Sequence, residues 1–200
     1  MPQTLDSSRP LRLSDTRRMT DRVAQGAEES RQDALLGLPP VNLREIQDDD
    51  ETFLAEVSTS DVEGEWNTFD DPPEERLSGT NYGGGARIVE IDARTRVGIV
   101  TWVQIPHGPN RRSLAWNVGI TIHPAFRGRH IGAAAQRAVA DHLFGTSDAN
   151  RVMAHTDIGN IAEQRSLERA GFSREGIARG AQWRQGAWHD GVIYSRVRSD

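Results

Sequence analysis

Cysteine and lysine are both absent from this chain of 200 residues. Without cysteine, the chain has no disulfide bond, no thiolate nucleophile and no cysteine zinc site, and a reducing compartment is compatible with its composition. All 24 of its strongly basic residues are arginine. We attribute this usage to genome composition, because a nucleic-acid-binding protein would not need to avoid lysine. Any nucleophilic or proton-transfer chemistry must therefore use groups other than a thiol.

Long apolar runs are also lacking. No segment approaches the roughly 20 apolar residues that a membrane-spanning helix needs, and the first residues show no signal-peptide pattern. We therefore expect a cytoplasmic protein without a membrane partner. The net charge of -5 argues against broad attraction to DNA or RNA. The histidines show no spacing typical of a metal triad, so we expect no metal.

The chain divides by composition into two parts. Residues 1–40 are polar and charged, and we expect an N-terminal extension that is partly helical or disordered, with one candidate helix from Asp15 to Leu36. Residues 41–200 have the patterns of one domain. Its first expected elements are a strand at Val41–Ile46, a helix at Glu51–Val57 capped by Asp48–Asp50, a flexible break at Gly83–Gly85, and paired strands at Ala86–Asp92 and Val97–Gln104.

The most informative stretch begins with a strand and continues into an anion-binding turn. Trp116–Ile122 alternates apolar and polar residues, and His123-Pro124 ends it. The Arg- and Gly-rich turn Arg127–Gly132 leads directly into the helical segment Ala133–Phe144. Free backbone N–H groups at a helix start, beside Gly and Arg, form a site for a phosphorylated ligand. The whole order of strands and helices predicts an α+β fold with a mixed sheet.

From Asn42 to Arg198 the chain resembles the GNAT superfamily of acyl-CoA-dependent N-acyltransferases, in the RimJ/RimL-like branch of ribosomal-protein N-terminal acetyltransferases. The resemblance is carried by Arg127–Gly132, by Asn160, by Ala170-Gly171-Phe172 and by the closing segment to Arg196. It implies the GNAT fold, a mixed central sheet flanked by helices, in which splayed strands form a groove for the acyl carrier. In the family the strand before the turn carries a bulge. His130 departs from the pattern, because relatives have glycine at this position.

The resemblance also implies the donor site. The signature strand pairs with the pantetheine arm and supplies a backbone N–H near the thioester carbonyl, the turn holds the pyrophosphate, and Asn160 contacts the arm. The donor is acetyl-CoA or another acyl-CoA, acting as co-substrate. The residues expected to bind it are Ile120, Thr121, Ile122, Arg127, Gly128, Arg129, His130, Ile131, Gly132, Ala133 and Asn160. His130 can donate to phosphate or point into solvent, and we favour the outward orientation.

Three residues are candidates for proton transfer. Glu163 is the first, because it occupies a position where many relatives have serine and a desolvated carboxyl has a raised pKa; an exposed charge on an amphipathic helix explains it as well. Tyr194 could protonate the leaving thiolate, although packing in a terminal strand is the simpler role. Glu90 could face the cleft, but a solvated strand face is the simpler explanation. His189 and Asp190 are adjacent on a strand and point to opposite faces, so they form no direct dyad.

The acceptor is an amine, either of a small molecule or of a peptide N-terminus. Trp66, Phe69, Trp183 and Trp188 fall in segments that surround the acceptor in this branch, so an apolar or planar acceptor would find contact area there. Relatives from bacteria with high-GC genomes often modify secondary metabolites, and many form homodimers. Two alternatives stay open: an amide-forming enzyme whose acyl donor is a carrier protein or a tRNA, and a non-catalytic ligand-binding module with the same fold.

Overall fold

The computed structural model describes residues 28, 31–59, 66 and 83–200. The chain divides into two compact units, Met1–Gly37 and Leu38–Asp200. In the first unit, residues 31–35 are helical, whereas most of the helix expected from Asp15 lies outside the described residues. The second unit contains the sheet and the candidate site.

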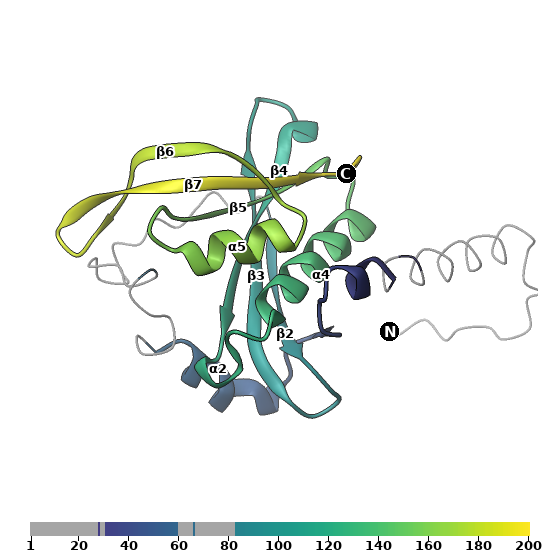
Figure 1. Ribbon diagram of the computed structural model, residues 1–200. Helices are drawn as coiled ribbons and strands as arrows, with labels where there is room; N and C mark the ends of the chain where they lie inside the picture. The colour runs from purple at the N-terminus through teal and green to yellow at the C-terminus, as the bar shows by residue number, and fades with distance from the viewer. Residues whose placement is uncertain (1–27, 29–30, 60–65, 67–82) are drawn as a thin grey trace, which may run out of the picture. The chain divides into compact units, whose positions relative to one another are not determined.

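The described part of the second unit forms a seven-stranded sheet in the order β1-β2-β3-β4-β5-β7-β6. Neighbouring strands are antiparallel except β4 and β5, which are parallel. The sheet is therefore mixed, flanked by helices (Figure 1), and the predicted α+β GNAT-type architecture is confirmed. Its elements are β1 (Asn42–Arg44), η1 (Asp48–Asp50), α2 (Glu51–Val57), β2 (Gly84–Glu90), β3 (Arg96–Pro106), η3 (Arg111–Ser113), β4 (Leu114–Ile122), η4 (Pro124–Phe126), α4 (Ile131–Thr146), β5 (Arg151–Asp157), α5 (Ile161–Arg169), β6 (Ser173–Arg184) and β7 (Ala187–Val197).

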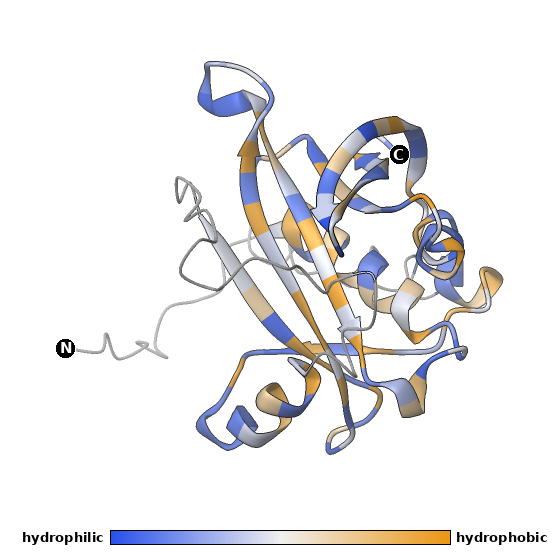
Figure 2. Cartoon of the chain, turned by 90° about the vertical axis from the view of Figure 1, so that its left-hand side faces the viewer, coloured by the Kyte–Doolittle hydropathy of each residue, from blue (hydrophilic) through white to orange (hydrophobic). Residues whose placement is uncertain are grey.

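Helix α4 covers one face of the sheet. Its buried side includes several alanines, whose small side chains let the helix axis approach the strands closely. A Cβ atom added at Gly132 would lie 3.9 Å from Ile122 Cγ1, and Trp116 Nε1 donates to Ser147 Oγ at 3.0 Å just after the helix. Apolar and polar residues alternate along the strands, as Figure 2 shows. Even-numbered residues of β4 therefore face α4, and odd-numbered residues face the opposite side.

Two local expectations need correction. Gly84 and Gly85 belong to β2 instead of forming a flexible break. A Cβ atom at Gly85 would lie 2.6 Å from the Trp102 ring, so glycine permits the indole to cross the strand. Residues Asp48–Asp50 form their own short 3-10 helix, closed by reciprocal bonds between Gln47 and Asp50. The acidic run therefore precedes α2 as an element and does not simply cap it.

Strands β4 and β5 separate beyond Asn117 and Met153, and we call this point of separation the fork. Their parallel pairing is confined to Trp116 with Val152 and Asn117 with Met153. Beyond that point β4 stays paired only with β3, in a regular register that runs to Ile122. The bulge expected from the family is therefore not seen in this ladder. The backbone groups of β4 that face β5 beyond Asn117 have no strand partner in the described part of the chain, and an extended ligand can pair with them.

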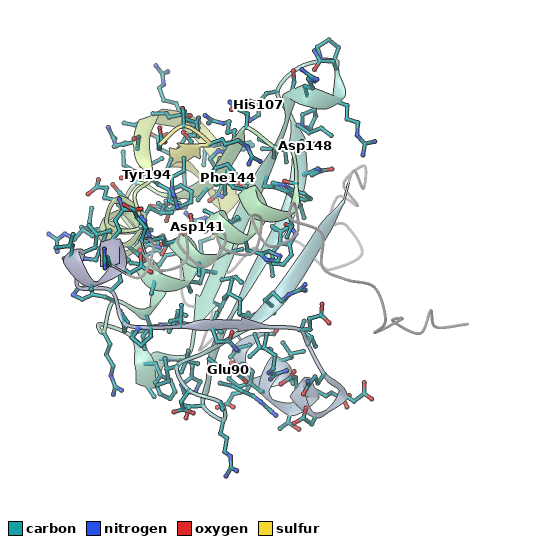
Figure 3. The ribbon with its side chains drawn as sticks, turned by 90° about the vertical axis from the view of Figure 1, so that its right-hand side faces the viewer. Glu90, His107, Asp141, Phe144, Asp148 and Tyr194 are labelled. Atoms are coloured by element: carbon teal, nitrogen blue, oxygen red, sulfur yellow. The ribbon has the colours of Figure 1, made fainter. Side chains whose placement is uncertain are left out.

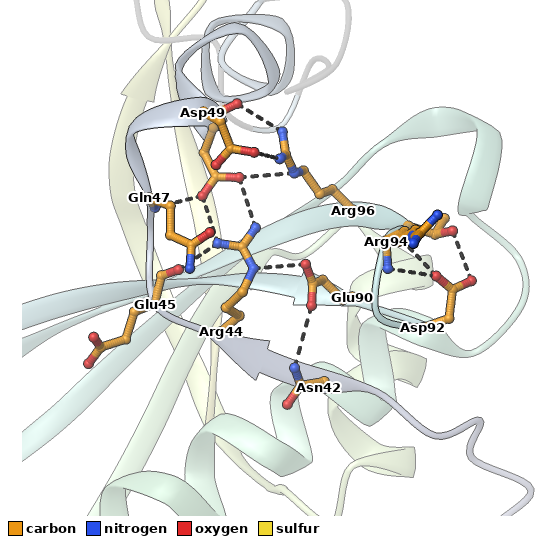
Figure 4. Close-up of polar contacts among 11 residues, drawn as sticks. Asn42, Arg44, Glu45, Gln47, Asp49, Glu90, Asp92, Arg94 and Arg96 are labelled. Atoms are coloured by element: carbon orange, nitrogen blue, oxygen red, sulfur yellow. Dashed lines mark hydrogen bonds and ion pairs between the residues drawn. The ribbon is translucent and has the colours of Figure 1, made fainter.

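Four charged residues join the first three strands (Figure 4). Arg44 donates to Glu90 Oε1 at 2.8 Å and to Asp50 Oδ1 at 2.9 Å. Arg96 Nε lies 3.0 Å from the same Asp50 oxygen. Asp50 is fully buried, and the hydrogen bond from Arg44 lowers its pKa to about 2. The cluster links β1, η1, β2 and β3 through one desolvated carboxylate.

Candidate functional site

The turn before α4 exposes the start of the helix. Gly128 and His130 both have positive φ, 75° and 60°, and no side chain caps the helix. Ala134 N donates to the His130 carbonyl at 3.1 Å, so the N–H groups of the preceding first turn have no intrahelical acceptor. These amides, together with the positive end of the helix dipole, have the features that favour an anion.

His130 occupies the left-handed region of the Ramachandran plot, which explains why glycine suits this position. For a residue with a Cβ atom this conformation costs about 1–2 kcal/mol. The His130 side chain is exposed, which fits both orientations considered from the sequence, and the outward one stays our prediction. Histidine in place of glycine therefore adds a backbone conformational cost to this turn.

Two arginines flank these amides. Arg127 Nε donates to the Ile122 carbonyl at 2.9 Å and so ties the turn to the end of β4. The Arg129 guanidinium lies 5.6 Å from the centre of the Phe126 ring. Arg129 is exposed and forms no ion pair within the described ranges. Its charge can therefore act on a phosphate bound at the helix start.

The other residues expected to bind the acyl donor lie on β4 and just after β5, the two strands that separate at the fork. Ile120, Thr121 and Ile122 lie on the unpaired edge of β4. Asn160 follows β5 and caps α5, its Oδ1 accepting from Glu163 N at 3.2 Å. The start of α4 packs against α5, because a Cβ atom at Gly132 would lie 3.2 Å from Ser166 Oγ. Ile131 and Ala133 are buried, so only their backbone can meet a ligand.

Glu163 lies half-buried between α5 and α4. It accepts a hydrogen bond from Gln136 Nε2, and Gln136 Oε1 accepts from Ser166 Oγ at 2.9 Å. Gln136 is buried. Burial raises the pKa of Glu163 to about 7, against the smaller opposing effect of the Gln136 hydrogen bond. Glu163 can therefore both hold and release a proton at neutral pH.

The other two proton-transfer candidates lie elsewhere and have structural partners. Tyr194 is fully buried in β7, and its hydroxyl donates to Glu168 Oε1 at 3.1 Å; burial, and then this hydrogen bond, raise its pKa. Glu90 is bound to Arg44. Figure 3 shows Glu90 and Tyr194 toward opposite ends of the molecule. For Tyr194 the geometry agrees with the packing role that the sequence favoured. For Glu90 the expected solvated strand face is wrong, because the carboxylate is buried and paired with Arg44.

The aromatic residues expected near the acceptor are partly described. The Trp66 ring lies against Gly159, where an added Cβ atom would come within 3.1 Å of it. Trp183 and Trp188 form an edge-to-face pair 5.4 Å apart near the tip of the β6–β7 hairpin. Phe69 lies outside the described residues. Aromatic surface is therefore present after β5 and on the hairpin.

A buried polar cluster at the end of β5 was not expected. Asp157 binds Arg184, and both side chains are almost fully buried. His189 Nδ1 lies 3.5 Å from Asp157 Oδ2, whereas Asp190 accepts from Gly180 N at 2.7 Å. His189 and Asp190 thus have different partners, as their alternation predicts. No sequence signal marked Arg184, because an arginine beside a hairpin turn is usually solvated.

Neither a metal-binding group nor a membrane-spanning helix is found among the described residues. In those ranges no group of three or more histidine, aspartate or glutamate side chains is arranged to hold a metal ion. The helices in the same ranges include none long and apolar enough to span a membrane.

Comparison with known proteins agrees with this geometry. A protein named probable N-acetyltransferase YjcK, from Bacillus subtilis, is 31% identical over 104 residues, which are 52% of this chain and 56% of the relative. The chain spans about half the length of the curated relatives it matches. Two solved structures share the fold. Mycobacterium smegmatis RimJ in complex with CoA-disulfide has a TM-score of 0.66 and 20% identity, covering 80% of this chain and 83% of that one.

The second solved structure is a Vibrio cholerae spermidine N-acetyltransferase in complex with CoA and spermine. It has a TM-score of 0.65 and 17% identity, covering 80% of this chain and 96% of that one. At this identity both structures establish the fold alone. The acetyltransferase (GNAT) domain family matches residues 41–173, a segment that contains the fork, the anion turn and Glu163. The chain therefore belongs to the GNAT acetyltransferase family.

Proposed function

We propose that the chain transfers an acetyl or other acyl group from acyl-CoA to a primary amine by direct attack of the amine on the thioester. The observation that carries this proposal is the fork between β4 and β5, which leads to the uncapped start of α4. An extended pantetheine arm fits the unpaired edge of β4, and its pyrophosphate fits the amides before Ala134. Both contacts use backbone groups, so they tolerate variation in side chains.

The residues around the fork supply the chemistry that this reaction needs. A backbone N–H on the free edge of β4 can donate to the thioester oxygen as negative charge develops there. Positioning the amine beside the carbonyl carbon supplies most of the remaining rate. Asn160 uses Oδ1 to cap α5, so its Nδ2 can donate to the arm. Glu163, with a pKa of about 7, can exchange the proton that the reaction moves.

The acceptor we propose is the amine of a small molecule or of a peptide N-terminus. RimJ and the spermidine N-acetyltransferase share this fold, and because one fold can serve different acceptors, it does not choose between them here. The aromatic side chains Trp66, Trp183 and Trp188 favour an acceptor with apolar or planar surface.

Calorimetric titration with acetyl-CoA and CoA tests the donor site. We expect binding in the micromolar range, weakened about tenfold or more in Arg129→Glu, because the variant places a negative charge beside the bound phosphates. Arg111→Glu, an equal charge change at an exposed arginine of η3, is the matched control and should bind like the unmodified chain. Absence of binding to the unmodified chain would refute the acyl-CoA donor and direct the search to carrier proteins and aminoacyl-tRNA.

A further inference from the structure

The sheet face opposite α4 carries its own set of polar residues at the fork. Trp116 points toward α4, so Asn117, the next residue of β4, points to the other face. Met153 is the parallel partner of Asn117, and partners in a ladder share a face. His155 follows Met153 by two residues and lies on this face as well. Asn117 and His155 therefore flank the point where β4 and β5 separate.

Asn117 has an unsatisfied acceptor. Its Oδ1 is buried and has no hydrogen-bond donor in the described part of the chain. A buried acceptor without a donor destabilises the folded chain, and such atoms in folded proteins commonly meet a ligand or an ordered water. A primary amine, which carries N–H donors, would satisfy this oxygen.

His155 borders a cavity on the same side of the sheet. The cavity has a volume of about 200 Å³ and lies where the β6–β7 ladder shifts register between Ala178 and Gln182. Its size suits a small side chain, and its walls are mainly apolar. The residues that line it are His155, Ala178, Ala181, Gln182 and Gly191.

The groups around His155 favour the neutral imidazole. Several effects lower the pKa of His155. The largest is its partial burial, followed by the positive charges of Arg151 and, when protonated, His107. Glu175 of β6 has the opposite effect, but its Oε1 is bound to Arg151 Nη1 at 2.6 Å. His107, on the loop after β3, places its Nε2 3.2 Å from Met153 Sδ.

The remaining charged groups near this face are paired with one another. Asp157, two residues beyond His155 on β5, is bound to Arg184 of β6 and faces His189 of β7. Among the described residues, His155 itself has no hydrogen-bond partner. An unprotonated ring nitrogen is thus available beside the cavity.

We propose that His155 is the catalytic base that removes a proton from the acceptor amine, while Asn117 Oδ1 accepts a second N–H of the same group. Met153, the ladder partner of Asn117, lies about 5 Å from it, and His155 follows two residues, about 7 Å, along β5, so we place the amine between the two side chains. The substituent of the amine occupies the 200 Å³ cavity. This inference rests on the proposed acyl transfer.

In the proposed step every bond that forms is matched by one that breaks, and every proton released has an acceptor. The amine nitrogen forms a bond to the thioester carbon, and His155 takes one proton from that nitrogen, directly or through one water. The carbon–sulfur bond then breaks, and the thiolate of CoA leaves and takes a proton from Glu163 or from solvent. His155 returns its proton to solvent before the next cycle.

The test compares His155→Gln with the unmodified chain. Release of CoA is followed with a thiol reagent, which meets no background because the chain has no cysteine. Acceptors are short peptides that begin with alanine or serine; if none is acetylated, hydrolysis of acetyl-CoA is measured instead, since the same base would activate water. His142→Gln is the control, because His142 packs against Trp102 on the α4 face.

We expect His155→Gln to bind acetyl-CoA within twofold of the unmodified chain and to lose about 100-fold or more in kcat/KM at pH 7. The loss should shrink as the pH rises, because the free amine then forms without a base. His142→Gln should retain its rate within twofold. A rate for His155→Gln within threefold of the unmodified chain at every pH would overturn the inference alone. Absence of acetyl-CoA binding to any variant would overturn the proposed function and this inference with it.

Asn117→Leu provides a second measurement. It removes the unsatisfied Oδ1 with little change in side-chain volume. We expect the KM for the amine substrate to rise at least fivefold while the pH dependence of kcat stays the same. An unchanged KM would show that Asn117 does not hold the amine.

Discussion

At the scale of single residues, His130 is the departure from the family pattern that the structure explains most directly. Its φ of 60° is a conformation that glycine adopts without strain and that L residues with a Cβ atom avoid. His130→Gly should therefore raise the free energy of unfolding by about 1 kcal/mol and the melting temperature by about 2–4 °C. Acetyl-CoA affinity should not fall, since the His130 side chain is exposed. A lower melting temperature would show that the imidazole makes a stabilising contact.

Glu163 gives a prediction about stability that is independent of catalysis. Its pKa in the folded chain is about 7, raised from 4.5. Between these values the folded chain binds more protons than the unfolded chain, so the free energy of unfolding decreases as the pH rises through this window and levels off above pH 7. Glu163→Gln removes this decrease. We expect the variant to be more stable than the unmodified chain at pH 8, by about 1 kcal/mol after allowance for partial exposure, with no such gain at pH 4.

The Glu163 comparison is made by urea denaturation at both pH values. A variant that is equally destabilised at pH 4 and pH 8 would mean that folding does not raise the pKa of Glu163. In that case Glu163 would be ionised at neutral pH and could not deliver a proton to the leaving thiolate.

At the scale of elements, the cluster centred on Asp50 holds η1 against the first strands. Asp50→Ala leaves Arg44 and Arg96 without their shared carboxylate, and we expect a loss of about 3 kcal/mol in the free energy of unfolding. The pKa of Asp50 is lowered from 3.8 to about 2, so its contribution is present above pH 3.8 and is lost as the pH falls through 2. Chemical denaturation at pH 7 and pH 2 checks this. A loss of the same size at both pH values would contradict the ion-pair explanation.

The elements themselves could be predicted from the sequence to within a few residues, because their signals are local. The alternation in Trp116–Ile122 and the alanine-rich segment after Gly132 both specify their elements through side-chain periodicity. The fork, by contrast, depends on how far β4 and β5 remain paired. That extent is set by tertiary packing, which no local pattern reports.

The donor side of the site could be predicted better than the acceptor side. Arg127, Gly132 and Asn160 lie in motifs with fixed spacing, so the resemblance located them. Asn117 and His155 come from different strands, and only the register of the β4–β5 ladder brings them together. Arg184 carries no sequence signal, yet it is buried and paired with Asp157 of β5.

At the scale of the whole molecule, the proposed reaction uses backbone amides, carboxyl groups and imidazoles, and it uses no metal ion. Transfer activity should therefore remain within twofold after dialysis against EDTA. The measurement is the rate of CoA release before and after dialysis, with added Mg²⁺ or Zn²⁺ as a control. A loss that a metal restores would show that a site in the chain binds a cation needed for the reaction.

The central claim is that the chain moves an acyl group from CoA to an amine. The most direct measurement is incubation with acetyl-CoA and a panel of small amines and short peptides, followed by the thiol assay and mass spectrometry of the acceptors. The account predicts amine-dependent release of CoA and one acetyl group added at the amine of at least one acceptor, with the rate lowered in Arg129→Glu. Tight binding of acetyl-CoA without an acetylated product or CoA release would contradict it and would favour a ligand-binding module.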